Sequence, residues 1–373
     1  MSTIIYKCPA CDGPLKFNAA AQKFTCEYCD SSFLEPELKK ILEERIEKEK
    51  QLFGESALEK ELNGGSAEPA ASSESAAEFD EGEMRAYTCP SCAAEIVTDT
   101  NTAATFCAFC HNPTILPSRL SGDFKPEKVI PFAVDKKAAE TLLHQYIKKK
   151  PLIPKGFTAQ SNLEKITGVY VPFWLFDCRS DGQIVFEAKN VKTWSSGNYR
   201  YTKTDIYHAF REGCADFALV PADGAEKFDD QLMDAIEPFD YSKIVDFSTA
   251  YLSGFYAEKY DVSKDESLPR VSKRCHKQVQ SLMTNTVSGY SSVKVPNNAL
   301  GLQNITDHYA LLPVWMLTYQ YQGKDYLFAV NGQSGKMAGN LPVSFSRAAL
   351  WFASIAGIGL ALSAIIFLLM SLL

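Results

Sequence analysis

Two clusters of CxxC motifs, alternating strand-like and helical segments, and a closing run without charge predict the fold class of this chain. We expect a multi-domain protein with two small β zinc ribbons, an α+β middle domain with mainly antiparallel sheet, and one C-terminal transmembrane helix. The expected boundaries are a first zinc ribbon over 1–34, a charged amphipathic helix over 35–62, a disordered acidic linker over 63–85, a second zinc ribbon over 86–120, an α+β cytoplasmic domain over 121–346 and the transmembrane helix over 347–373.

The cysteines reveal an internal duplication. Eight of the eleven cysteines fall in CxxC pairs, and each one in the second cluster stands 81 positions after its counterpart in the first. A CxxC turn can direct two thiolates at one ion, and two such turns joined by a short β-hairpin complete the tetrahedral shell of a structural zinc site. We therefore expect two structural Zn²⁺ ions, with ligands Cys8, Cys11, Cys26 and Cys29 in the first ribbon, and Cys89, Cys92, Cys107 and Cys110 in the second.

The other three cysteines stand apart from these motifs. We expect most of the chain to lie in the cytoplasm, for reasons given below. The cytoplasm is reducing, so disulfides are not expected. We interpret Cys178, Cys214 and Cys275 as free, buried thiols.

The charge of the ribbons favours protein partners over nucleic acid. The whole chain carries a formal charge of −7. Three lysines of the first ribbon are cancelled by three acidic residues, and Arg119 of the second is outweighed by Glu95 and Asp99. Phosphate recognition needs several lysines or arginines on one face. Nucleic acid is therefore an unlikely partner for either ribbon.

The segment between the ribbons divides into two parts. Glu35 to Leu62 is charged and carries apolar residues at helical intervals, which predicts an amphipathic helix. The stretch that follows is acidic and poor in large apolar residues. Such a composition cannot bury enough surface to fold, so it predicts a disordered tether.

The middle domain alternates strand and helix signals. Asp135 is a plausible N-cap for the helix that follows it, and later runs rich in β-branched and aromatic residues predict strands. The predicted strands span 166–178, 183–194 and 199–212, followed by helices near 229–236 and 263–285 and a meander from 309 with turns at 322–323 and 331–332.

A second, fainter repeat lies within these strands. Val171-Pro-Phe-Trp174 resembles Leu312-Pro-Val-Trp315, and we interpret the pair as two related structural elements. Proline inside a strand favours an edge strand or a bulge.

The run from Ala348 to Leu373 has no charged residue and no proline, and it is apolar on all faces. As a helix it is long enough to cross the hydrocarbon core of a bilayer, about 30 Å thick. The N-terminus lacks the pattern of a signal peptide, and Arg347 precedes the run, as the positive-inside tendency favours. We expect a single-pass cell-membrane protein that contacts the lipid bilayer through residues 348–373, with its N-terminal bulk in the cytoplasm.

Motifs of catalysis are missing from the sequence. It holds no HExxH, no G-x-S-x-G and no P-loop. We therefore expect that the protein is not an enzyme and has no catalytic residues.

Two longer motifs, Gly168 to Asp177 (GVYVPFWLFD) and Pro313 to Lys336, carry a resemblance to a known family. Together with the ribbons and the membrane tail, they resemble the YdjG-type bacterial membrane proteins with TFIIB-type zinc ribbons, encoded beside PspA-like phage-shock proteins. The resemblance implies membrane recruitment of a PspA-like envelope-stress protein, with SPFH-like and further membrane partners. Relatives are often labelled PriA-like primosomal helicases, but the nucleotide-binding motifs of a helicase are missing here.

Two hypotheses follow from these observations. The first is a membrane-anchored zinc-ribbon scaffold or adaptor that recruits cytoplasmic proteins by protein–protein interaction. The alternative is a membrane-tethered nucleic-acid-binding zinc-ribbon protein, and the neutral ribbons count against it.

Overall fold

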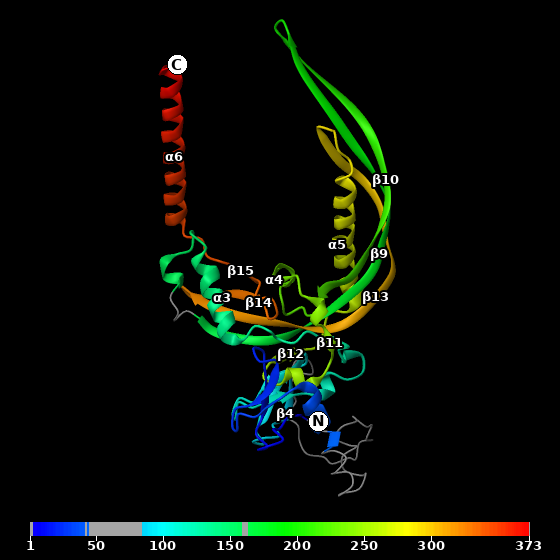
Figure 1. The fold of residues 1–373 in the computed structure, drawn as a ribbon, viewed down its shortest axis with the longest axis vertical. Coiled ribbons are helices and arrows are strands. Elements are labelled where there is room, and N and C mark those ends of the chain that lie inside the picture. Colours follow the sequence, from blue (N-terminus) through cyan, green and yellow to red (C-terminus); the bar gives the residue numbers. More distant parts are fainter. Residues whose placement is uncertain (1–2, 42, 45–83, 159–162, 373) are drawn as a thin grey trace.

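The computed structural model describes residues 3–41, 43–44, 84–158 and 163–372 (Figure 1). Of the predicted amphipathic helix, residues 35–41 and 43–44 are helical, and the rest lies outside the described residues. The predicted linker lies outside them as well, except for Met84 and Arg85, which begin a strand.

The described residues form a three-stranded, a two-stranded and a ten-stranded sheet, together with four α-helices that the structure describes from end to end. The small sheets comprise β1 (Leu15–Asn18), β2 (Lys23–Cys26) and β3 (Ser32–Phe33), and β4 (Met84–Thr88) with β5 (Glu95–Asp99). The large sheet comprises β6 (Thr102–Phe106), β7 (Pro113–Ile115), β8 (Lys128–Val129), β9 (Leu163–Ser196), β10 (Tyr199–Asp223), β11 (Val245–Asp246), β12 (Tyr256–Glu258), β13 (Ser292–Tyr321), β14 (Lys324–Asn331) and β15 (Met337–Gly339). The helices are α3 (Lys136–Lys148), α4 (Asp230–Ile236), α5 (Lys264–Thr284) and α6 (Phe345–Leu372), and 3₁₀ turns span Pro117–Arg119, Gly122–Phe124, Lys155–Thr158, Tyr241–Lys243 and Thr249–Leu252.

The large sheet is mixed. Most of its strand pairs are antiparallel, as predicted, but β12 pairs with β9, and β8 with β13, in parallel. The helix predictions agree closely with the structure, because Asp135, Asp229 and Ser263 each cap a helix through their side chains.

Three strands form a long curved arm, which we define as residues 179–217 and 292–303 of β9, β10 and β13 (Figure 1). The separate strands predicted at 166–178 and 183–194 are in fact one strand, so the predicted break is wrong. Gly182 lies at this point with φ +145°, opposite Gly213 of β10 and Leu300 of β13. Glycine there lets the strand continue through a turn-like sequence. The helix α5 packs on the arm through Val279 and Met283, and Val287, which follows the helix, joins the same cluster.

The Pro-containing repeat forms the centre of the middle domain. Val171 pairs with Leu312, so the two copies lie opposite each other in β9 and β13. Pairing of β9 with β10 ends at Phe173 and pairing with β12 begins at Tyr170. Pro172 therefore lies between the segments of β9 that pair with β10 and with β12. No hydrogen bond between strands needs a backbone N–H there, so proline is tolerated.

Pro313 lies at the same kind of position between β14 and β8. Each proline carbonyl accepts a hydrogen bond from a glycine amide, Gly224 for Pro172 and Gly332 for Pro313. The repeat tryptophans are equivalent too. Trp174 Nε1 donates to the Val262 carbonyl at 3.0 Å, and Trp315 Nε1 to the Val134 carbonyl at 2.8 Å. Both valines directly precede the N-cap residue of a helix, α5 or α3. The middle domain is thus built from two related halves.

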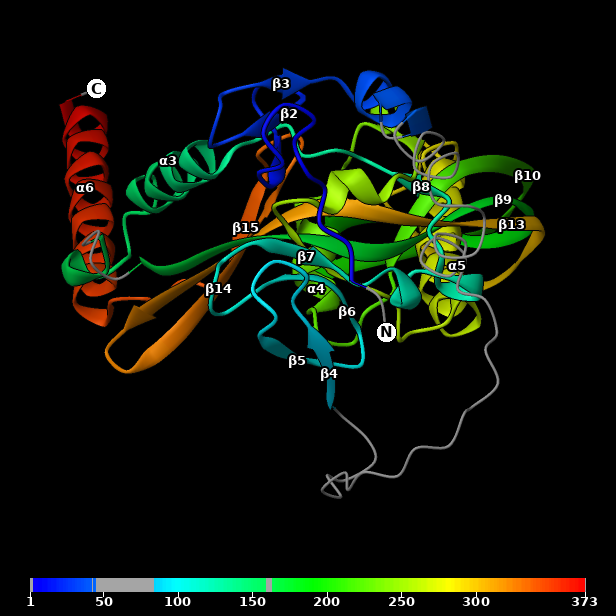
Figure 2. The same ribbon diagram turned by 90° about the horizontal axis from the view of Figure 1, so that it is seen from below.

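The CxxC-containing regions are joined to this domain. In the second, β6 pairs with β12, so sheet hydrogen bonds cross the boundary expected at 120/121. In the first, the Phe17 amide donates to the Ser253 carbonyl at 2.9 Å, and Leu15, Phe17 and Phe24 belong to the main hydrophobic core. An Ile4–Ile115 bridge connects the two regions. Figure 2 shows their small sheets, β1–β3 and β4–β5, on the two sides of β9 and β13.

Among the described residues, α6 is the one helix long and apolar enough to cross a membrane, over Phe345–Phe367. Its first turn is held by the middle domain. The Ser344 amide donates to the Leu152 carbonyl at 2.8 Å, and the Arg347 guanidinium donates to the Ile153 carbonyl. Figure 1 shows α6 and the arm on one side of the body, and the CxxC regions on the other.

Candidate metal centres

All four CxxC motifs fold into the same turn. In each, the first cysteine carbonyl accepts a hydrogen bond of 2.9–3.0 Å from the residue four positions later. That residue has φ between 56° and 59°, in the left-handed region. The four left-handed residues are Asp12, Asp30, Ala93 and His111. This repeated turn explains how short polypeptide segments of different sequence present two sulfurs to one point.

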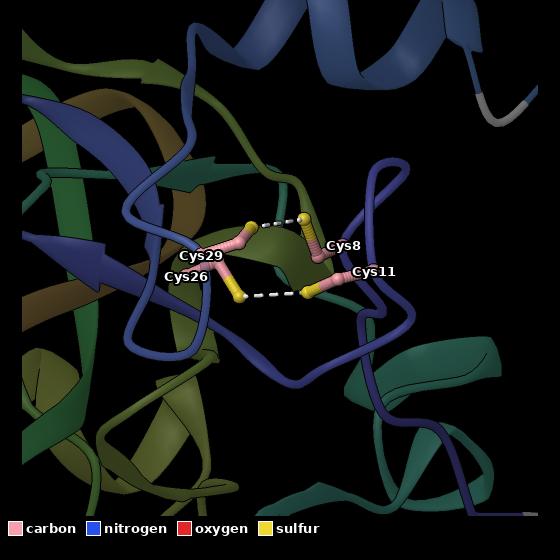
Figure 3. Close-up of side chains that lie close together, drawn as sticks. All are labelled: Cys8, Cys11, Cys26 and Cys29. Atoms are coloured by element: carbon pink, nitrogen blue, oxygen red, sulfur yellow. Dashed lines mark hydrogen bonds between the residues drawn. The ribbon is translucent and has the colours of Figure 1, made fainter.

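The eight predicted ligands gather into two clusters of four. In the first, the Sγ–Sγ distances are 3.6 Å for Cys8–Cys29 and 3.4 Å for Cys11–Cys26 (Figure 3). In the second, Cys89–Cys110 and Cys92–Cys107 are both 3.7 Å apart. All four sulfurs of each cluster lie within 4.8 Å of one another. A tetrahedral ion with metal–sulfur bonds of about 2.3 Å requires sulfur–sulfur edges of about 3.8 Å, so each cluster fits such an ion.

Local hydrogen bonds favour the thiolate form in one cysteine of each cluster, whereas the pKa values of Cys11, Cys92 and Cys110 are raised, because burial and the neighbouring sulfurs outweigh a backbone amide. The side-chain hydroxyl and backbone amide of Ser31 lower the pKa of Cys29 to about 6. Burial would raise the pKa of Cys107, but the backbone amides of Cys110 and Phe109 outweigh it and lower the pKa to about 7. A thiolate is the form of cysteine that ligates metals. Sulfur donors of this kind select Zn²⁺ and other thiophilic ions.

Each cluster is partly sealed from solvent. Cys8 and Cys26 of the first, and Cys89 and Cys107 of the second, are buried, whereas their partners lie at or near the surface. With four cysteines around one point, an ion bound here would have a filled tetrahedral shell and would serve structure.

The two clusters differ in the strands that connect their CxxC turns. In the first, β1 and β2 form the predicted hairpin, with Leu15 paired to Cys26. In the second, the predicted hairpin does not form, because β5 pairs with β4 while β6 pairs with β7 and β12. The chain reverses instead at Asp99, whose carboxylate accepts from the Thr102 amide at 2.7 Å. Because β6 belongs to the large sheet, it does not pair with β5.

One aromatic residue projects from each cluster. Tyr28 and Phe109 occupy the same position in their CxxC motifs, and they are 74% and 72% exposed. The apolar residues at the other equivalent position, Leu15 and Ile96, are buried. The duplication therefore preserves one buried and one exposed apolar position. Large exposed aromatics are the side chains most enriched at protein interfaces.

The structure brings together two of the three other cysteines. Cys178 and Cys275 are buried with their sulfurs 3.8 Å apart, between β9 and α5. Burial raises the pKa of Cys275 to about 12, as expected of an unreactive thiol. Cys214 was predicted to be buried and is exposed, with its sulfur 2.8 Å from an Arg179 guanidinium nitrogen. Alternation along β10 places it on the solvent face.

Comparisons with known proteins identify a relative. No protein-family model and no solved structure matches the chain. The uncharacterized protein YdjG of Bacillus subtilis (strain 168) is 41% identical over 243 residues, which make up 65% of this chain and 71% of YdjG. At this identity and coverage two chains share their fold and ancestry. The chain therefore belongs to the same protein family as YdjG.

Proposed function

We propose that this protein is a membrane-anchored scaffold that recruits cytoplasmic proteins through two zinc ribbons. The observation that carries the proposal is the pair of exposed aromatics, Tyr28 and Phe109, fixed at equivalent places on two tetra-cysteine clusters. Four thiol ligands leave an ion no open position for a substrate, so the clusters support binding better than catalysis. The ion in each is Zn²⁺, the usual partner of four cysteines in this spacing.

The membrane part of the proposal assigns α6 as a single-pass anchor in the cell membrane, with the ribbons in the cytoplasm. Its apolar composition and length support a span over Phe345–Phe367. The clusters lie on the opposite side of the body from α6 (Figure 1), where cytoplasmic proteins reach them. The family resemblance suggests a PspA-like envelope-stress protein as one of these partners.

The test of recruitment is capture of cytoplasmic partners from membranes that carry the full chain. We expect the double variant Tyr28→Ser/Phe109→Ser to lose most captured protein, because it removes apolar contact area and leaves every cysteine in place. The matched control is Tyr199→Ser, which removes an aromatic 72% exposed at the tip of the arm. Equal capture by the double variant and the wild type would rule out recruitment through the aromatics.

Two measurements test the remaining parts. Elemental analysis of the purified chain should find two zinc ions per chain, and one ion in Cys89→Ser/Cys92→Ser.

A salt titration of nucleic-acid binding addresses the alternative function. Steep, salt-sensitive affinity would favour nucleic acid, whereas the balanced charge of the ribbons leads us to expect none.

A further inference from the structure

The C-terminal end of α3 lies beside the base of α6. Residues 151–153 follow α3, and their carbonyls bind the start of the membrane helix. The Leu152 carbonyl accepts from the Ser344 amide, and the Ile153 carbonyl accepts from the Arg347 guanidinium. Figures 1 and 2 both show the two helices next to each other. The last turn of α3 is therefore held at the level where α6 leaves the folded body.

Three consecutive lysines occupy this end of α3. Lys148, Lys149 and Lys150 are all exposed. The Lys150 ammonium lies 4.9 Å from the centre of the Tyr146 ring. Within the described part of the chain, none of the three forms an ion pair with a carboxylate. Their charge is thus available to a ligand outside the chain.

Apolar and aromatic side chains surround the same place. Val343, Phe345 and Trp351 are 57%, 88% and 49% exposed at or near the start of α6. Lysine and aromatic residues at the end of an apolar helix form the composition typical of a membrane–water interface. A lysine cluster of this kind interacts with anionic lipid at the cytoplasmic leaflet.

We propose that Lys148, Lys149 and Lys150 bind the phosphate groups of anionic phospholipids around the base of α6. The inference rests on the proposed membrane anchoring and adds a lipid class and the residues that recognise it. The net charge of −7 would otherwise repel an anionic membrane surface from the soluble body. A local patch of three positive charges, placed where body and bilayer meet, offsets that repulsion.

The lysines also suit the negative end of the α3 dipole, and that role is purely structural. The experiment must therefore read lipid contact directly. The full chain is placed in nanodiscs of phosphatidylcholine with a small amount of dansyl-labelled phosphatidylglycerol. The chain holds four tryptophans, so the part of the energy transfer that is lost in Trp351→Phe is assigned to Trp351, near the base of α6, and reports local enrichment of the anionic lipid. Dansyl-labelled phosphatidylcholine provides the baseline.

We expect stronger transfer to labelled phosphatidylglycerol than to labelled phosphatidylcholine, and loss of the difference in high salt. The triple variant Lys148→Gln/Lys149→Gln/Lys150→Gln should abolish the difference. The control Lys192→Gln/Lys203→Gln, on the arm, should keep it. Equal transfer to both lipids in the wild type, or an unchanged difference in the triple variant, would overturn the proposal.

Alkaline extraction of the same samples separates this inference from the anchoring itself. A triple variant that stays in the membrane but loses the lipid preference supports the inference. A wild-type chain that is extracted would refute the anchor and the lipid site together. Addition of inorganic phosphate tests the ligand source, because competition by free phosphate at low concentration would contradict a bilayer-specific site.

Discussion

At the residue scale, the chain depends on a few positions where backbone conformation decides what fits. The four CxxC turns need a left-handed residue, and the sequence supplies Asp, Asp, Ala and His there. No shared residue type marks this position. The cysteine spacing alone predicted the ligands, because thiol chemistry constrains it, whereas the left-handed residue had to be observed.

Gly182 is the most demanding of these positions. A Cβ added there would lie 2.0 Å from the carbonyl oxygen of Ala299 in β13. We expect Gly182→Ala to lower the free energy of unfolding by about 1–3 kcal/mol, from strain at positive φ and displacement of β13. Urea unfolding of the purified chain measures the effect.

Gly301 provides the control for this substitution. It lies nearby in β13, opposite Asp181, and a Cβ there would meet nothing within 4 Å. Gly301→Ala should leave stability unchanged or raise it by up to about 1 kcal/mol. Equal losses for both variants would show that the close approach at Gly182 does not control the arm.

At the element scale, the sequence predicted helices better than strands. Helix starts have local chemical signals, and Asp135, Asp229 and Ser263 supplied them. The length of a strand is set by its neighbours, which one sequence does not reveal. The residues near Asp181 and Gly182 have turn-like composition, yet β10 and β13 hold them in an extended ladder. The same reason explains why β6 pairs with strands of the large sheet and not with β5 in the predicted hairpin.

The N-terminus of α5 offers a direct test of a local signal. Ser263 accepts a hydrogen bond from the Glu266 amide, and the Glu266 carboxylate accepts from the Ser263 amide, which completes a capping box. We expect Ser263→Ala to destabilise the protein by about 1 kcal/mol. The matched substitution Ser281→Ala, at an exposed position within α5, should change stability by less than about 0.5 kcal/mol. Thermal unfolding of both variants distinguishes capping from a general effect of serine removal.

At the scale of the whole molecule, the first metal cluster is joined to the main core. Phe17 and Phe24 each pack against Tyr251 of the middle domain, with ring centroids 5.3 and 5.9 Å apart. The second cluster has a small core of its own around Ile96, while Ala103, Ala104 and Ile115 of β6 and β7 belong to the main core through the large sheet. The sequence showed the duplication of the clusters, but it gave no signal for this difference in how they are attached.

This difference predicts unequal effects of metal loss. Cys26→Ser should lower the melting temperature of the whole soluble body, because the β1–β2 hairpin supports the main core. Cys107→Ser should lower the melting temperature less, since β6, which leads to Cys107, is also held by its pairing with β7 and β12 of the large sheet. Calorimetry of the two variants, each with its metal content measured, provides the test. Equal decreases in the melting temperature of the two variants would mean that attachment to the main core does not determine the effect of metal loss.

The shared direction of the arm and α6 has a consequence for insertion. The arm carries charged side chains and an open strand edge, and neither can enter hydrocarbon. A bilayer extending around α6 would occupy the space in which the arm stands in Figure 1. The first turn of α6 is bound to residues 151–153, so the arm is the part that must bend away from α6 when the protein is embedded. The membrane-embedded and lipid-free forms should therefore differ in outline.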